Sequence, residues 1–219
     1  GVLIAPAPYS APAAYYFPSI ARMQAVEILK GSSQVQYGPF TSGGAINMVS
    51  TEIPEQFNGN IKASYGTFDT ARLHANVGGR NDNFGYMLEF LNYNSNGFKN
   101  LGDDLNTGFD INDVVAKVSY RTNSSAKVQH EVGLKFQYYD ELSNETYLGL
   151  TNEDFAASSF NRYASSQIDN MDADHLQLQL THTLNINKNL RITTDAYINN
   201  FARNWYKLDD VVFNGEKEK

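Results

Sequence analysis

Histidines are the residues here whose chemistry is most versatile, and the chain has four, at positions 74, 130, 175 and 182. No two of them have the His-Glu-x-x-His spacing of a zinc protease. Serine, histidine and aspartate all occur, but no nucleophile elbow accompanies them. His130 and His182 fall on apolar faces near short turns, which favours positions at an interface over metal ligation.

An acidic stretch is the second candidate for chemistry. It contains Asp103, Asp104, Asn106, Asp110 and Asp113, oxygen donors of the kind that calcium prefers. Their spacing fits no EF-hand, so a solvated acidic loop is the favoured interpretation. The chain has no cysteine, which excludes disulfides and cysteine metal sites. We therefore expect no enzyme, no catalytic residues, no bound metal and no cofactor.

Composition narrows the range of partners. The net charge is -7 and the pI is about 5.0, whereas a nucleic-acid-binding domain needs a basic face. We therefore expect no nucleic acid. No apolar run is long enough for a membrane helix. The mean hydropathy of -0.44 is also compatible with a membrane β-barrel, because its strands alternate apolar and polar residues and average out as hydrophilic.

The composition of the sequence divides the chain into two parts. Residues 1–55 are rich in proline, alanine and glycine and carry few charges, whereas residues 56–219 contain repeated amphipathic runs. The change occurs near Ile53-Pro54-Glu55. We predict one domain, or part of one, over residues 1–55 and another over residues 56–219.

The second part alternates with a period of two, which predicts strands with two different faces. Several runs have about ten residues, the length that a tilted strand needs to cross a bilayer. Seven apolar faces begin at Ile61, Ala71, Phe84, Val114, Val128, Leu176 and Leu190. The opposite faces are polar and carry Glu89, Lys117, Ser119, Gln129, Glu131, Lys135, Gln137, Gln177, Gln179 and Thr181.

The links between these runs differ in length in an ordered way. Tight turns are expected at residues 78–82, 121–126 and 185–189, and long links at 94–109 and 141–171 on the opposite side. Outer-membrane barrels have short turns on one side and long loops on the other. A soluble antiparallel sheet with one wet face remains the alternative, but it has no reason to sort its links. We therefore predict an all-β fold, a partial transmembrane antiparallel β-barrel.

The most specific motif lies in the first part. Residues 26–50 read VEILKGSSQVQYGPFTSGGAINMVS. This stretch resembles the plug signature of TonB-dependent outer-membrane receptors. Ser32 departs from the proline found in many members. The matching positions are Val26, Glu27, Ile28, Leu29, Lys30, Gly31, Tyr37, Gly38, Gly43, Gly44, Ile46 and Asn47. Glycines at such positions permit positive φ and close packing inside a barrel.

The segment before the motif narrows the resemblance. GVLIAPAPYSAPAAYYFP is similar to the ferric citrate receptor subgroup, and FARNWYKLD at residues 201–209 is a looser match. The resemblance implies a fragment: the C-terminal part of an α+β plug, then about seven of about 22 barrel strands. It also implies energy-driven uptake of a ferric siderophore, most simply a ferric citrate-like chelate, across the outer membrane of a Gram-negative bacterium. The implied partners are that chelate, outer-membrane lipid and the TonB–ExbB–ExbD complex.

Three alternatives stay open. One is a TonB-dependent receptor for another siderophore, cobalamin or a glycan. Another is a passive porin or an adhesin barrel, although porins lack the plug motif. The third is a soluble β-rich binding protein.

Two sets of residues are candidates for roles within this scheme. The expected ligand site consists of Tyr9, Ser10, Tyr15 and Tyr16 at the plug apex, with Arg162 from the long loop. Tyrosines offer hydroxyl groups and flat surfaces, and the arginine fork suits carboxylates. We also expect charge pairs between the plug and the barrel wall, from Glu27 and Lys30 to wall residues such as Glu89, Glu131 and Lys135.

Overall fold

The computed structural model describes residues 2, 18–31, 37, 43–102, 105–213 and 216–218. Several positions of interest fall outside these ranges. They are Tyr9, Ser10, Tyr15, Tyr16 and Gly38, together with Asp103 and Asp104.

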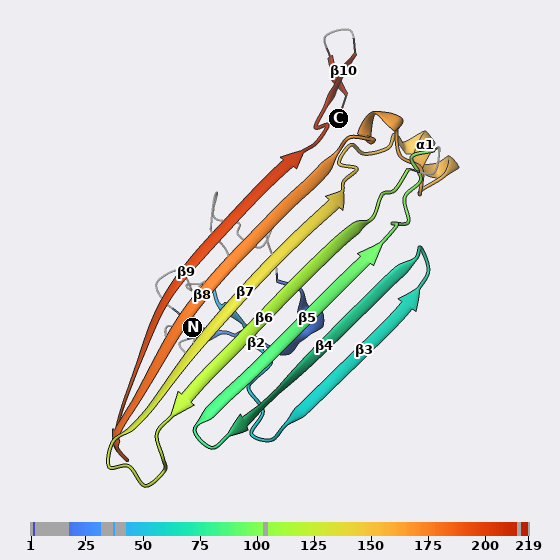
Figure 1. The fold of residues 1–219 in the computed structure, drawn as a ribbon. Coiled ribbons are helices and arrows are strands. Elements are labelled where there is room, and N and C mark those ends of the chain that lie inside the picture. The colour runs from blue at the N-terminus through green and yellow to red at the C-terminus, as the bar shows by residue number, and fades with distance from the viewer. Residues whose placement is uncertain are drawn as a thin grey trace.

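Seven strands form one antiparallel sheet, called the wall below (Figure 1). Each strand pairs with its neighbours in the sequence, so the topology is a simple meander. The strands are β3 (Asn58–Gly66), β4 (Thr70–Asn81), β5 (Phe84–Ser95), β6 (Phe109–Arg121), β7 (Gln129–Asn144), β8 (Asn170–Asn187) and β9 (Leu190–Tyr206). The prediction of seven antiparallel strands is confirmed.

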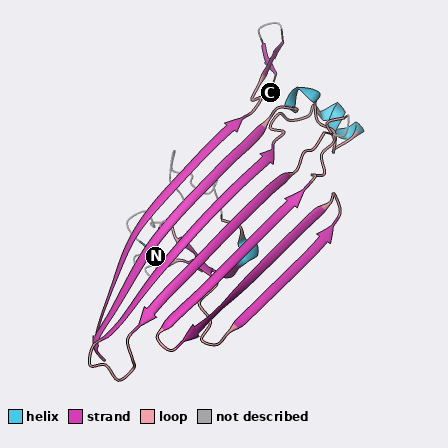
Figure 2. Ribbon diagram, in the orientation of Figure 1, coloured by secondary structure: helices cyan, strands magenta, loops and turns pink. Residues whose placement is uncertain are grey.

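The links are sorted by length as expected, with one exception, the three-residue link 67–69 on the side of the long loops. The turn predicted at residues 78–82 is residues 82–83, because β4 continues to Asn81. Residues 82–83, 122–128 and 188–189 make short connections at one end of the wall, the short-turn end. Residues 67–69, 96–108 and 145–169 connect strands at the other, the long-loop end. The last link contains α1 (Asn152–Ala157) and a 3-10 helix (Ala164–Ser166), which cap this end in Figure 2.

Several strands extend further than their apolar runs. The apolar run of β8 begins at Leu176 and that of β9 ends near Ile198, but the two strands also pair over the polar positions outside these runs, for example between Asp172 and Asn204. Backbone hydrogen bonds hold these extensions, and such bonds need no apolar side chain. The long link is therefore residues 145–169 and not 141–171 as predicted.

The two faces of the wall differ as the alternation predicts. On β5, Leu88 is 52% exposed while the next residue, Glu89, is fully buried. The outer face carries exposed leucine, valine, phenylalanine and tyrosine side chains over the middle of the wall. The inner face is more mixed than expected, because Met87, Leu91 and Val115 are buried there among the polar groups.

The described part of the N-terminal segment, residues 18–31 and 43–57, lies against the inner face of the wall (Figure 1). A short 3-10 helix (Ile20–Arg22) follows Pro18. It leads into β1 (Met23–Leu29), which pairs antiparallel with β2 (Ala45–Ser50). Residues 51–57 then connect β2 to β3, and the predicted domain boundary falls within this link.

A second small hairpin follows the wall. It consists of β10 (Val211–Phe213) and β11 (Glu216–Glu218). Among the residues described, no helix combines the length and the apolar character needed to cross a membrane.

Candidate functional site

A buried cluster of charges joins the N-terminal segment to the wall. Arg22, at the end of the 3-10 helix, directs its guanidinium at two carboxylates on the inner face. Its Nε donates to Asp113 on β6, and its Nη1 lies 4.0 Å from Oε2 of Glu89 on β5. The Arg22 side chain is 1% exposed and both carboxylates are fully buried. In so dry a setting a charge is stable only when it is paired.

Glu89 is the centre of this cluster. Its Oε1 accepts a hydrogen bond of 2.6 Å from the Thr51 hydroxyl and lies 2.9 Å from Nε2 of His74 on β4. Asp113 in turn accepts from the Gln137 amide at 3.3 Å. The cluster therefore ties Arg22 and Thr51 of the N-terminal segment to β4, β5, β6 and β7.

Two lysines complete the inner face beside the carboxylates. Lys117 of β6 donates to the Ser50 hydroxyl at 2.8 Å and to the Thr51 carbonyl at 2.6 Å. Lys135 of β7 lies directly opposite Lys117 and donates to the Gln177 amide oxygen at 2.7 Å. The wall thus contributes both signs of charge to the contact, and Lys117 binds the backbone of the N-terminal segment as well as a side chain.

A second ionic contact lies in the link that leads to β3. Glu55 accepts two hydrogen bonds from Arg121, at 2.8 and 2.7 Å, and its Oε1 lies 3.3 Å from Nε of Arg80. The hydrogen bonds from Arg121 lower the pKa of Glu55. The side chains of Glu55 and Arg121 are 63% and 42% exposed, so this contact is solvated, unlike the Arg22 cluster.

The expected pairing of Glu27 with the wall is wrong. Glu27 faces Asn47 across the β1–β2 pair and accepts a hydrogen bond of 2.8 Å from its amide. Its position in the middle of β1 makes it a cross-strand partner within the hairpin. Lys30 follows β1 directly, and its pairing with the wall stays a prediction. Glu89, a wall residue foreseen for such contacts, does meet the N-terminal segment, but through Arg22 and Thr51, which were not foreseen. Lys135 binds Gln177 of the wall itself.

The glycines of the motif behave differently from one another. Gly31 has φ +76° and Gly44 has φ +132°, conformations that favour glycine. A Cβ on Gly44 would also lie 3.0 Å from the Leu29 carbonyl. Gly43 has no such restriction, because a Cβ there would meet nothing within 4 Å. Tyr37 is half-buried, and Gly38 lies outside the described residues.

The expected ligand residues are only partly described. Arg162 lies in the long loop, where its Nη1 donates to the carbonyls of Ser159 and Asn161 at 3.0 and 2.6 Å. Its backbone N–H donates to Asn100 of the neighbouring loop at 2.7 Å. These bonds shape the loop. Roles for Arg162 and for Tyr9, Ser10, Tyr15 and Tyr16 in ligand binding stay predictions.

Sequence reasoning missed a cationic and aromatic group at the long-loop end. The Lys207 ammonium lies 3.4 Å from the ring centroid of Tyr147 and 4.6 Å from that of Trp205. The Arg203 guanidinium lies 5.1 Å from the Trp205 ring. The signal was present, since Arg203, Trp205 and Lys207 alternate along β9 and the residue after it, so they share one face.

Known proteins provide a comparison for this architecture. No protein-family model matches the chain. Among solved structures, the ferric citrate transporter FecA in its unliganded form matches 85% of the chain with a TM-score of 0.68. The chain has the fold of part of FecA. This match confirms the architecture that the plug motif implied, a segment of barrel wall with an N-terminal segment on its inner face.

The match to FecA has two limits that bear on function. Sequence identity is 20%, so the likeness concerns the fold. The chain spans 28% of the length of FecA, so the activity, ligand and partners of the whole protein are matters for proposal.

Proposed function

We propose that this chain is part of a TonB-dependent outer-membrane receptor that imports a ferric chelate of the ferric citrate class. In this proposal, residues 1–55 are the C-terminal part of the plug and residues 56–219 are the first part of the barrel. The energy comes from the inner-membrane TonB–ExbB–ExbD complex, and the receptor lies in the outer membrane of a Gram-negative bacterium.

The observation that carries the proposal is the buried contact between Arg22 and the wall carboxylates Glu89 and Asp113. A passive pore needs an open lumen, whereas here an N-terminal segment is held on the inner face by buried charges and by Lys117. Charged contacts of this kind hold a closure in one position and can be exchanged for water when the closure moves. This supports a gated, energised pathway over a passive porin.

The choice of an anionic ligand rests on the long-loop end. Arg162, Arg203 and Lys207 provide positive charge there, and Tyr147 and Trp205 provide aromatic surface. Carboxylates of an iron–citrate chelate are matched by guanidinium and ammonium groups. Acidic residues of the same loop, including Glu145 and Asp169, oppose the attraction, so the cations must act at short range.

Uptake of radiolabelled ferric citrate by cells that express the full-length receptor tests the proposal. Uptake should require both the receptor and an intact TonB system. Uptake that persists without TonB would indicate a passive pore. Absence of ferric citrate binding, with binding of another siderophore, cobalamin or a glycan, would reassign the ligand and leave the receptor class in place. Solubility of the full-length protein without detergent would contradict the membrane assignment.

A further inference from the structure

Residues 51–57, the link between β2 and β3, pass over two glycines of the wall, and these two positions are called the track below. The track is formed by Gly78 of β4 and Gly85 of β5 on the inner face. A Cβ on Gly78 would lie 2.9 Å from Cδ of Pro54, and one on Gly85 would lie 2.9 Å from Cγ2 of Ile53. Any larger residue would push the link away, so the two glycines allow it to lie directly on the wall.

Ionic contacts hold the link in this track. Glu55 follows Pro54 and receives the two-pronged hydrogen bonds of Arg121, with Arg80 at 3.3 Å on its other side. Arg80 lies one residue before the end of β4, and Arg121 is the last residue of β6. The Glu55 carboxylate therefore bridges the two strands that flank β5. A bidentate arginine–carboxylate pair is the most directional ionic contact available to side chains.

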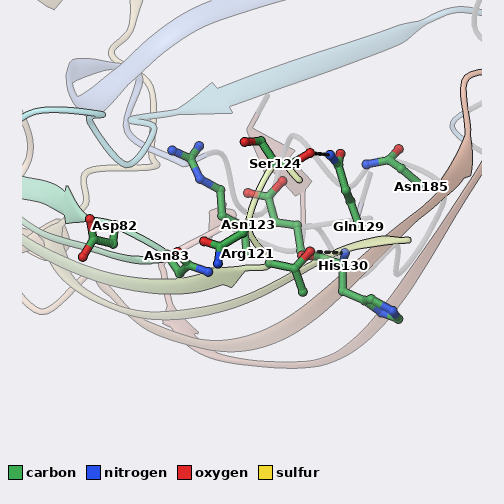
Figure 3. Close-up of a pocket in the computed structure, with 10 residues that line it drawn as sticks. Asp82, Asn83, Arg121, Asn123, Ser124, Gln129, His130 and Asn185 are labelled. Atoms are coloured by element: carbon green, nitrogen blue, oxygen red, sulfur yellow. Dashed lines mark hydrogen bonds between the residues drawn. The ribbon is translucent and has the colours of Figure 1, made fainter. Parts of the chain in front are cut away.

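The clamp remains open to water. Arg121 also lines a polar depression at the short-turn end together with Asp82, Asn83 and Glu131 (Figure 3). Glu131 adds a second negative charge near Arg121. The pair therefore carries less of the desolvation cost that the buried Arg22 cluster carries, so it holds the link without withdrawing these charges from water.

The link is the only covalent connection between the N-terminal segment and the wall, so it transmits any pull on that segment to the wall. Residue 58 begins β3, so any tension on the N-terminal segment reaches the register of β3 through residues 51–57. Strand pairs separate one hydrogen bond at a time when they are pulled from an end. A clamp upstream of Asn58 would take this load before the strand does.

We propose that Glu55 is a positioning residue that anchors the link to the wall while the segment before residue 51 rearranges. The proposal rests on the proposed transport function, because only a plug that is pulled needs such an anchor. The seat on Gly78 and Gly85 sets the path of the link, and Arg80 and Arg121 hold it there. The part of the plug that moves during transport therefore ends before Ile53.

Hydrogen exchange in the purified full-length receptor tests the anchor without any ligand. Glu55→Gln removes the charge and keeps the shape, so the amides of residues 52–57 should exchange about two to five times faster. Glu52→Gln is the matched control, because this carboxylate has no ion pair among the described residues. Arg121→Gln should increase the exchange of residues 52–57 as much as Glu55→Gln does. The double variant should exchange little faster than either single variant, because both substitutions remove the same ion pair. Equal exchange in Glu55→Gln and Glu52→Gln overturns the anchor.

A reversible tether tests whether the link stays in place during transport. The chain has no cysteine, so Glu55→Cys with Arg121→Cys introduces one unambiguous pair at two positions whose native side chains are in contact. A short bifunctional methanethiosulfonate joins the two thiols and replaces the ion pair by a covalent bridge that a reductant releases. Crosslinking should leave ferric citrate uptake within twofold of the released form, with each single-cysteine variant as control. Uptake that is lost on crosslinking and restored by the reductant overturns the anchor. If the parent imports nothing, the transport proposal fails and the exchange comparison alone decides whether the clamp exists.

Discussion

Arg22 and Asp113 form an ion pair between the N-terminal segment and the wall, with both side chains withdrawn from solvent. They are 91 residues apart in the sequence. Breaking such a pair by removing one partner leaves an uncompensated buried charge, which makes the contact sensitive to single substitutions.

Arg22→Met should weaken docking of the N-terminal segment by about 3 kcal/mol, because Asp113 loses its ion-pair partner and Glu89 loses the arginine that lies 4.0 Å away. Hydrogen exchange over β2 in the full-length receptor should increase accordingly. Adding Asp113→Asn to Arg22→Met removes one of the unpaired charges and should recover part of the loss. A double variant that is less protected than Arg22→Met would contradict this account.

Gly44→Ala should destabilise the β1–β2 hairpin by about 1–3 kcal/mol, because φ is +132° and the new Cβ would crowd the Leu29 carbonyl. Gly43→Ala is the neighbouring control. A Cβ there meets nothing within 4 Å, so the change should be close to neutral. Exchange protection of residues 45–50 reports both effects, and equal losses at the two positions would refute the backbone argument.

The Glu55 clamp should depend on pH only in the acid range. Its hydrogen bonds with Arg121 lower the pKa of Glu55 below the ordinary value of 4.5, and Arg80 adds to this. A carboxyl with a depressed pKa in the folded state contributes stability above its unfolded pKa and loses it as pH falls through the folded pKa. Exchange of residues 52–57, corrected for intrinsic rates, should therefore stay constant from pH 7 to about 5 and increase below the ordinary value. Glu55→Gln should lack this dependence, and a loss near neutral pH would exclude Glu55 as its cause.

Leu134→Lys should destabilise the receptor in lipid by about 2–4 kcal/mol, because Leu134 lies within β7 on the outer face and is 40% exposed. The control is Leu190→Lys. Leu190 is the first residue of β9 at the short-turn end, where the cost should be about 0–1 kcal/mol. Urea unfolding of the receptor in vesicles measures both values. Equal costs would mean that Leu134 does not face the bilayer core.

Lys207→Gln should weaken ferric citrate binding by the full-length receptor about three- to tenfold, because one cation near the aromatic group is lost. Lys188→Gln, in the turn at the opposite end of the wall, should leave binding unchanged. Tyr9→Ala and Arg162→Ala test the residues expected from the sequence. Unchanged affinity in both would remove them from the site, and no binding by the parent would remove the ligand assignment.

The sequence by itself determined the wall. Side chains alternate between two faces of a strand, so a period of two in a run such as residues 84–90 is local information. The lengths of the links are equally local, and the plug motif lies within residues 26–50. The strand order, the outer face and the sorting of loops could all be predicted for this reason. The ends of β8 and β9 could not, because pairing beyond the apolar runs depends on whether the neighbouring strand also continues.

Only the tertiary structure decided which charges meet. Glu27 and Lys30 stand out in the sequence because their neighbours are apolar, yet Glu27 bonds to Asn47 of the same hairpin. Arg22 looks ordinary in the sequence, and its partners are Glu89 and Asp113 on two separate strands. Charge pairing over such separations depends on how the N-terminal segment docks against the curved wall, and no local pattern encodes that position. The same holds for Glu55, whose partners Arg80 and Arg121 approach it only because glycines at 78 and 85 let the link lie on the sheet.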